Sequence, residues 1–175
     1  MIAGAVKIED SGPILYKQER TAVFGETFPM FKFRTMNIGG ESATPTTDGE
    51  NDRITRVGRM LRQTHFDEIP QLWSILRGNM SVVGPRAVWT EEEHILEDKA
   101  QMWRKRWFVK PGLTGLAQIN NASSVEPDVK LQYDLQYVRK QSVVYDLKIV
   151  VRQIWMVISD VVSVLRGHSP ADSDD

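Results

Sequence analysis

Two adjacent carboxylates, Asp67 and Glu68, are the residues of this chain best placed to do chemistry. Pro70 follows them, and because proline is tolerated in a helix only in its first turn, it predicts a helix that starts near Asp67 and ends near Gly78. The helix dipole favours the ionised form of a carboxylate at this end, and the free N–H groups suit a phosphate. The pair could therefore supply a nucleophile toward phosphorus and a ligand for Mg²⁺.

The same dipeptide also has an ordinary structural interpretation. Aspartate and glutamate are common in the first turn of helices, where they cap the backbone and face solvent. Taken alone, the two carboxylates favour this simpler interpretation. The surrounding segments reverse the balance, because they carry basic residues, glycines and prolines in a recognisable order.

Seven segments surround the pair: 16–20 (YKQER), 31–36 (FKFRTM), 53–62 (RITRVGRMLR), 76–86 (LRGNMSVVGPR), 110–120 (KPGLTGLAQIN), 133–138 (YDLQYV) and 146–149 (DLKI). In this order and spacing, over about residues 11–160, the set closely resembles the bacterial sugar transferase family. These are monotopic phosphoglycosyltransferases, which move a sugar phosphate from a nucleotide sugar to a polyprenyl phosphate. The chain departs from the family pattern at Ala87, at Lys110 and at Asn121–Ala122.

The resemblance implies roles for individual residues. Asp67 would be the nucleophile that forms a covalent intermediate, and Glu68 would share the catalytic work. Mg²⁺ would be the cofactor, held by Glu68 and Asp134. Substrate phosphates would be bound by Arg62, Arg86, Lys32 and Lys110. Further candidates for the site are Gln18, Arg34, Pro85, Gln118 and Tyr137.

The resemblance also implies partners and a location. The expected substrates are a nucleoside diphosphate sugar, most simply a UDP-sugar, and a polyprenyl phosphate at the cytoplasmic face of the cell membrane. The product would initiate a surface glycan or exopolysaccharide. Members of the family normally enter the membrane through a hydrophobic N-terminal segment, and residues 1–6 are too short to serve. We therefore expect a fragment, or a start placed late, that is peripheral or soluble by itself.

Composition narrows the alternatives. The 175 residues carry a net charge of −1, whereas nucleic-acid-binding proteins usually have a strong basic excess, so no nucleic-acid partner is expected. The chain has no cysteine and therefore no disulfide or thiolate metal site. Two alternatives to the enzyme remain: a non-catalytic membrane-associated scaffold of the same fold and, more remotely, a nucleic-acid binder that uses the arginine-rich segment 53–62.

The predicted fold class is α+β: a mostly helical single domain over residues 1–168 with a small N-terminal β-hairpin, amphipathic membrane-interface helices and a disordered acidic tail at 169–175. The hairpin spans 13–36 and turns at Gly25. Residues 37–51 form a loop, either a mobile lid or a variable insertion. Helices are expected from a cap at Asp52 through Leu61, from a capping box at Thr90 to about Trp107, over 124–140, and over 143–166. The last one, broken by charges, should lie at a membrane interface or pack internally rather than span a bilayer.

Overall fold

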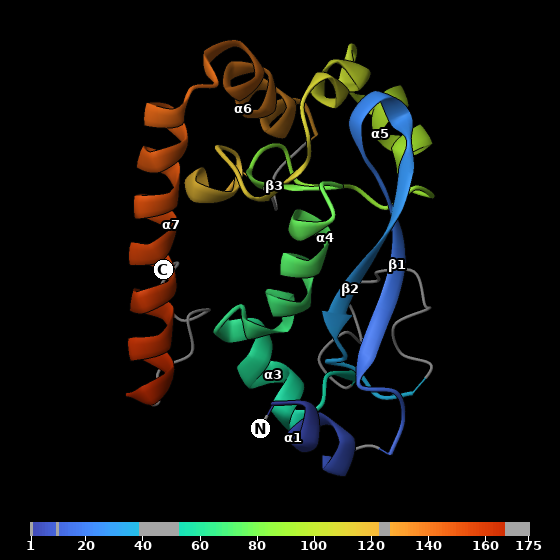
Figure 1. The fold of residues 1–175 in the computed structure, drawn as a ribbon, viewed down its shortest axis with the longest axis vertical. Coiled ribbons are helices and arrows are strands. Elements are labelled where there is room, and N and C mark those ends of the chain that lie inside the picture. The colour runs from blue at the N-terminus through green and yellow to red at the C-terminus, as the bar shows by residue number, and fades with distance from the viewer. Residues whose placement is uncertain (1, 10, 39–52, 123–126, 167–175) are drawn as a thin grey trace. The chain divides into compact units, whose positions relative to one another are not determined.

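The computed structural model describes residues 2–9, 11–38, 53–122 and 127–166. It is mostly helical with a small antiparallel hairpin near the N-terminus, which confirms the predicted α+β class (Figure 1). By its internal contacts the chain divides into two compact units. Unit 1 comprises Met1–Lys17, Phe31–Pro70 and Val157–Asp175, and unit 2 comprises Gln18–Met30 and Gln71–Met156. A single domain over 1–168 stays a prediction.

The hairpin formed as expected. Strand β1 covers Leu15–Thr21 and β2 covers Thr27–Phe33, and they pair with each other. A short 3₁₀ turn, η1 (Val23–Gly25), joins them, and Gly25 has a φ of 81°, a backbone conformation that glycine adopts without a steric penalty. The loop predicted at 37–51 and the tail at 169–175 lie largely or wholly outside the described residues.

Unit 1 is built around helix α3, Arg56–Gln63. Its N-cap is Thr55, whose hydroxyl accepts a hydrogen bond from the Gly58 N–H at 2.9 Å. The carboxylate of Glu9, the last residue of helix α1 (Ile2–Glu9), accepts bonds from the backbone N–H groups of Arg56 and Val57 at 2.7 and 3.0 Å. The predicted cap, Asp52, lies outside the described residues, and Thr55 supplies the capping in the structure because it directly precedes the first helical turn.

The chain then enters η2, a 3₁₀-helix over Phe66–Gln71 that carries the two carboxylates. His65 precedes it with a φ of 59°, and its carbonyl accepts a hydrogen bond from the Glu68 N–H at 3.2 Å. The prediction of an α-helix from Asp67 is therefore wrong for its first part, because the segment begins with i-to-i+3 hydrogen bonding as a 3₁₀-helix. Only α4, Leu72–Leu76, is α-helical. Gly78, with a φ of 80°, follows α4 where the helix was expected to end.

Unit 2 holds a small parallel sheet that sequence patterns did not predict. Strand β3, Ser81–Val83, pairs with β4, Gly112–Thr114, in the register Ser81 to Gly112 and Val83 to Thr114. Glycine is what permits the pairing, because a Cβ on Gly112 would collide with the backbone of Gly84.

The remaining helices of unit 2 are α5 (Glu93–Lys99), η3 (Trp103–Phe108), η4 (Gln118–Asn120), α6 (Pro127–Lys140) and the first part of α7 (Val143–Leu165). The last two confirm the predicted helices at 124–140 and 143–166 within the described residues. The single helix expected from Thr90 to Trp107 is wrong, because the chain breaks at Met102, whose φ is 68°. The Glu93 carboxylate accepts a bond from the Trp103 indole N–H at 2.6 Å instead of capping a helix.

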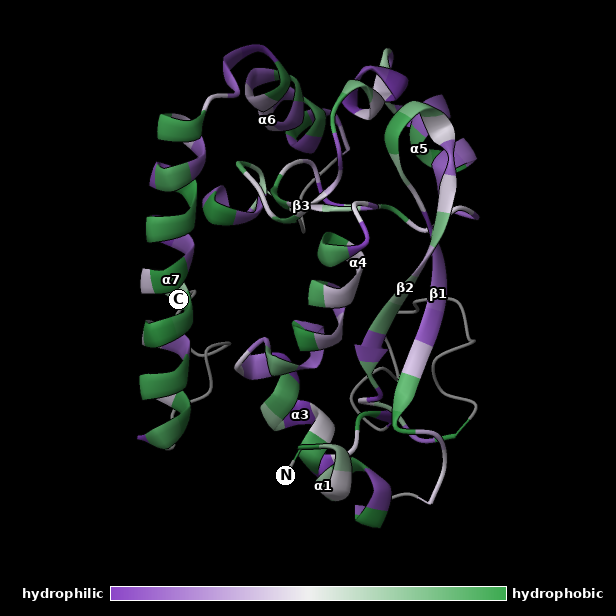
Figure 2. Ribbon diagram, in the orientation of Figure 1, coloured by the Kyte–Doolittle hydropathy of each residue, from purple (hydrophilic) through white to green (hydrophobic). Residues whose placement is uncertain are grey.

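Helix α7 presents a continuous apolar face (Figure 2). Ile149 is buried in the core of unit 2, whereas a series of large apolar side chains at three- and four-residue spacing is exposed: Val144, Leu147, Val151, Ile154, Trp155, Ile158, Val162 and Leu165. None of the described helices is long and apolar enough to cross a membrane.

Gly58 provides a test of how tightly unit 1 is packed. A Cβ at this position would collide with the backbone carbonyl of Thr35, so Gly58→Ala should destabilise the protein by about 1–3 kcal/mol although alanine favours helix. Gly4→Ala is the matched control, because Gly4 lies in helix α1 with no atom near the added methyl group. Chemical unfolding of both variants measures the difference. An equal stability for the two would contradict the close contact between α3 and Thr35.

Candidate active site

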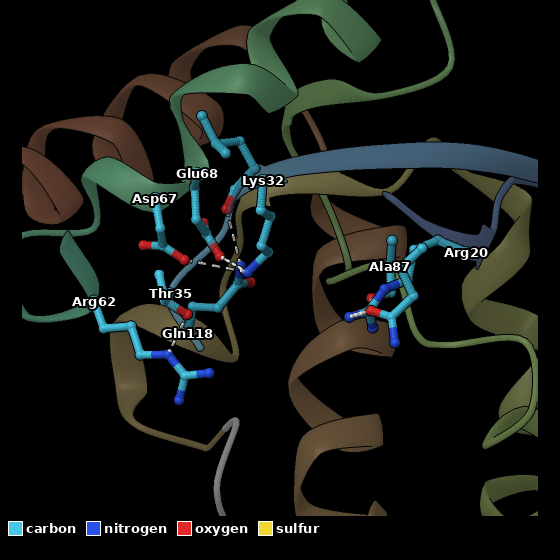
Figure 3. A network of polar contacts seen from close by, with 10 residues as sticks. Arg20, Lys32, Thr35, Arg62, Asp67, Glu68, Ala87 and Gln118 are labelled. Carbon is cyan, nitrogen blue, oxygen red and sulfur yellow. Dashed lines mark hydrogen bonds and ion pairs between the residues drawn. The ribbon is translucent and has the colours of Figure 1, made fainter. Parts of the chain in front are cut away.

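Three charged side chains meet in unit 1. The Lys32 amine lies 2.7 Å from Glu68 Oε1 and 3.8 Å from Asp67 Oδ2 (Figure 3). Lys32 extends from β2, and both carboxylates belong to η2. Their side chains are only 11–20% exposed, so the cluster is largely withdrawn from water while remaining open to a ligand. The structure thus brings Lys32 together with Asp67 and Glu68, while its predicted phosphate-binding role stays a prediction.

Burial dominates the acidity of Asp67. Loss of hydration raises the pKa of this carboxyl, and the Lys32 ammonium acts in the opposite direction. Glu68 also raises the pKa of Asp67, while His65 and Arg62 lower it. The expected helix dipole favours the ionised form, but burial acts the other way and is the larger effect. Burial therefore makes Asp67 more basic than an ordinary aspartate, and the neighbouring cations limit this effect.

Arg62 is oriented by Thr35. The guanidinium Nε of Arg62, in the last turn of α3, donates to the Thr35 hydroxyl at 2.9 Å (Figure 3). The Thr35 carbonyl in turn accepts from the Thr55 N–H at 3.0 Å. Thr35 thus connects Arg62 to the start of its own helix. Thr35 lies inside the motif at 31–36, but sequence reasoning did not single it out, because the partner of a hydroxyl cannot be read from spacing.

His65, between α3 and η2, has a partner on α7. Its Nε2 lies 3.5 Å from Asp160 Oδ2 of α7, an ion pair when the imidazole is protonated. Its backbone N–H donates to the Arg62 carbonyl at 3.2 Å, while its own carbonyl receives the Glu68 N–H. The turn at His65 therefore fixes the spacing between Arg62 and the two carboxylates.

Unit 2 holds Pro85, Arg86 and Lys110. The Pro85 carbonyl accepts from the Gly112 N–H at 2.9 Å, and the Gly84 N–H donates to the Thr114 carbonyl at 2.9 Å. Proline restricts φ at position 85, and these two hydrogen bonds hold the backbone of Gly84 and Pro85. Lys110 is exposed, and its carbonyl packs so closely on Gly84 that a side chain at that glycine would collide with it. The phosphate-binding roles of Arg86 and Lys110 stay predictions.

Asp134 and Tyr137 are buried in unit 2. Asp134 Oδ2 forms an ion pair with Arg106 Nη2 at 2.8 Å, and its side chain is 1% exposed. Burial raises the pKa of the Asp134 carboxyl, and the Arg106 charge counteracts this effect. The Tyr137 hydroxyl lies within hydrogen-bonding distance of the Val83 carbonyl and of Asp146. Both residues thus have partners that explain them structurally, and the metal-binding role of Asp134 stays a prediction.

The other predicted site residues have local partners. Gln18 accepts a hydrogen bond from Arg20, and Gln118 donates to the Leu113 carbonyl at 3.1 Å, all in unit 2. Arg34, in unit 1, is buried beside Gly12, where a Cβ would collide with its guanidinium. The structure therefore brings together Asp67, Glu68, Lys32 and Arg62 as one charged cluster. Among the described residues, no group of three or more histidines or carboxylates forms a ready-made metal cage.

The sequence of this chain was compared with those of known protein families. The family model of the bacterial sugar transferases matches residues 1–160. The chain belongs to the bacterial sugar transferase family.

Individual sugar transferases match over most of this chain. The UDP-glucose:undecaprenyl-phosphate glucose-1-phosphate transferase of Xanthomonas campestris pv. campestris is 38% identical over 157 residues, covering 86% of this chain and 32% of that protein. The Escherichia coli (strain K12) protein of the same name is 40% identical over 157 residues, covering 85% and 33%. The exopolysaccharide production protein ExoY of Rhizobium meliloti (strain 1021) is 38% identical over 170 residues, covering 88% and 74%. The chain thus spans about a third of the length of the first two relatives.

The electrostatics of this sugar transferase cluster can be measured without any assay of turnover. Lys32→Met should raise the pKa of Asp67, because it removes the nearest positive charge from a buried carboxyl. A ¹³C NMR titration of the carboxyl groups reads this pKa directly. Lys7→Met is the matched control, since Lys7 is exposed in the same unit and is not among the charges that act on Asp67. An unchanged Asp67 titration in Lys32→Met would show that the amine does not control this carboxyl.

Proposed function

We propose that this chain transfers a sugar 1-phosphate from a nucleoside diphosphate sugar to a polyprenyl phosphate through a covalent intermediate on Asp67. One observation carries the proposal: a buried carboxylate of raised pKa stands beside a second carboxylate, a lysine amine and an arginine. The relatives add support, since several are named as UDP-glucose:undecaprenyl-phosphate glucose-1-phosphate transferases. A UDP-sugar and a long-chain polyprenyl phosphate are accordingly the proposed substrates.

The proposed reaction has two displacements at one phosphorus. A carboxylate oxygen of Asp67 attacks the phosphorus that bears the sugar, and the bond from this phosphorus to the bridging oxygen breaks, so that the nucleoside monophosphate leaves with the electron pair. An oxygen of the polyprenyl phosphate then attacks the same phosphorus. The Asp67–phosphorus bond breaks, and a polyprenyl diphosphate sugar is released. Two half-reactions on one carboxylate require ping-pong kinetics.

The neighbouring cations have defined tasks in this scheme. Phosphoryl transfer is catalysed mainly by positioning and by stabilisation of charge on the phosphate oxygens. Lys32, near both carboxylates, keeps Asp67 ionised until substrate arrives and can then interact with the phosphate. Arg62, held by Thr35, offers the remaining N–H groups of its guanidinium to phosphate oxygens. Arg86 and Lys110 are proposed to bind substrate phosphates as well.

Mg²⁺ is the proposed cofactor, with Glu68 as its protein ligand. In phosphoryl-transfer sites Mg²⁺ is commonly held by one or two carboxylates together with substrate phosphates and water, so a three-carboxylate cage is not required. The pair Asp67–Glu68 fits this chemistry, since its oxygens already bind the ammonium of Lys32. The ion would neutralise the diphosphate charge, while Lys32 and the protein hold Glu68 in place.

The proposed biological role is the first step of a surface glycan or exopolysaccharide. Relatives named for exopolysaccharide production favour this role. A catalytically silent scaffold of the same fold is the alternative, and it predicts no intermediate on Asp67. The near-neutral charge continues to disfavour a nucleic-acid partner.

A membrane surface at the cytoplasmic face is the proposed location, with α7 as the contact. Its exposed apolar face includes Trp155, and Lys148 and Arg152 lie on the same helix. Each basic residue near an anionic surface contributes about 1 kcal/mol to binding, and the apolar side chains contribute more by burial. This arrangement suits a helix that lies in the interface rather than one that crosses it.

The covalent scheme is tested with Asp67→Asn. We expect loss of transfer beyond the roughly 10²–10⁴-fold that follows removal of a general acid or base, because the nucleophile itself is gone. We also expect the variant to be at least as stable as the parent at neutral pH. The folded pKa of Asp67 lies above its unfolded value, so ionised Asp67 costs stability, and asparagine removes this cost.

Release of UMP from UDP-glucose and intact-mass detection of a sugar-phosphate adduct measure this prediction. The same assay with and without Mg²⁺ tests the cofactor, and Glu68→Gln should shift the Mg²⁺ requirement. Asp128→Asn is a control, because it makes the same change at an exposed carboxyl. Turnover by pure Asp67→Asn protein would overturn the covalent scheme, and an absence of UMP release from the parent would favour the scaffold.

The membrane proposal is tested by flotation with anionic vesicles. Leu147→Glu combined with Ile158→Glu should reduce binding strongly, because two charges enter the exposed apolar face. Gln132→Glu with Gln136→Glu adds the same charge at exposed positions of α6 and serves as the control. Binding by the parent that resists a carbonate wash would contradict surface attachment. No flotation of the parent would remove lipid as the partner of α7.

A further inference from the structure

The backbone of Arg86 is anchored by hydrogen bonds that arrive from several elements of unit 2. The Pro85 carbonyl accepts from the Gly112 N–H at 2.9 Å, the Ala87 carbonyl from Arg20 Nη1 at 3.2 Å, and the Val88 carbonyl from the Thr21 N–H at 3.0 Å. The Arg86 carbonyl between them accepts from Arg106 Nη2 at 2.7 Å. Four consecutive carbonyls are thus held, two of them by guanidinium groups, and the bond to Arg86 is the shorter of those two.

The guanidinium of Arg106 is itself fixed on three sides. Its Nη2 forms the ion pair with Asp134 at 2.8 Å. Its planar group stacks over the Trp103 ring at 4.3 Å from the centroid. Trp103 is in turn held by its indole bond to Glu93. Side-chain exposures of 3% for Arg106 and 1% for Asp134 leave neither group accessible to a substrate.

A buried ion pair is a weak source of net stability, since an apolar pair of similar volume often replaces it without loss. Its retention therefore calls for another consequence. In this structure the consequence is geometric, because Arg106 supplies a charge-assisted donor to the backbone carbonyl of the half-buried Arg86.

We infer that Arg106 and Asp134 are positioning residues, a buried pair that fixes the backbone of Arg86 so that its guanidinium is presented to substrate phosphate in one orientation. This inference rests on the proposed function, which gives Arg86 its phosphate. It also assigns Asp134 a role other than metal binding. Preorganisation of this kind increases binding because less conformational freedom is lost when the ligand arrives.

The experiment replaces the pair by apolar side chains, Arg106→Met with Asp134→Leu. The parent and the variant should unfold at similar temperatures, because the double change removes both charges of the pair, and nearby Lys130 loses one repelling and one attracting charge together. Hydrogen–deuterium exchange of residues 84–88 should nevertheless become faster, and KM for UDP-glucose should rise roughly tenfold with a smaller change in kcat, as expected for loss of one hydrogen bond to a charged group. If the pair only stabilised the fold, neither the exchange rate of residues 84–88 nor KM should change.

Two controls keep the outcomes distinct. Glu97→Leu with Arg104→Met removes a neighbouring exposed ion pair and should alter neither exchange nor KM. In an Arg86→Ala background, removal of the buried pair should add nothing to the rise in KM, because the pair acts through Arg86.

Exchange of residues 84–88 that matches the parent in the pair-replaced variant overturns the inference. Faster exchange with parental KM upholds the anchoring but overturns the phosphate role of Arg86. A parental KM in Arg86→Ala alone would likewise count against the proposed function rather than against the anchoring.

Discussion

The contact of one lysine with two carboxylates is the interaction on which the rest of the site depends. Asp67 and Glu68 are adjacent in sequence and largely buried, so their charges repel each other in a poorly hydrated place. The Lys32 ammonium offsets only part of this repulsion, because it lies 2.7 Å from Glu68 but 3.8 Å from Asp67. The asymmetry leaves Asp67 the less satisfied carboxylate. A group that is destabilised as an anion, but not neutralised by a close partner, is well suited to attack an electrophile.

Such a cluster requires a rigid frame, and unit 1 supplies it through backbone contacts. Gly58 allows α3 to approach Thr35 so closely that no side chain would fit between them. Thr35 binds Arg62 through its hydroxyl and the Thr55 N–H through its carbonyl, while Glu9 caps the same helix. The left-handed turn at His65 then connects α3 to the carboxylates. Residues in this conformation cost free energy and persist where the surroundings hold them. The frame thus fixes the positions of groups that would otherwise separate.

Sequence reasoning selected several charged residues that lie together in the structure, but it predicted the elements that carry them less well. Pro70 and Gly78 correctly bracketed a helical segment, but an i-to-i+3 hydrogen bond made its start a 3₁₀-helix, which composition does not specify. The capping-box pattern at Thr90 failed because Glu93 found a tertiary partner in Trp103. The β3–β4 pairing joins segments about 30 residues apart, beyond any local pattern. Long amphipathic helices such as α6 and α7 were predictable because their periodicity extends over many turns. Thr35 and Arg106 were missed for one reason: each acts through a partner distant in sequence.

Two groups of buried charges among the described residues differ in how far they are exposed to solvent. In unit 2, Arg106 pairs with Asp134 close to Lys130, and a tryptophan face covers the guanidinium. Such a pair is inert, since removal of either charge would leave the other unpaired in the interior. In unit 1, one amine faces two carboxylates, and the side chains keep some exposure to solvent. This partial exposure is what the proposed contact with a substrate phosphate requires, and the pair in unit 2 lacks it. Exposure, rather than the presence of charged residues, therefore distinguishes the charged groups that hold the fold from those that a ligand could reach.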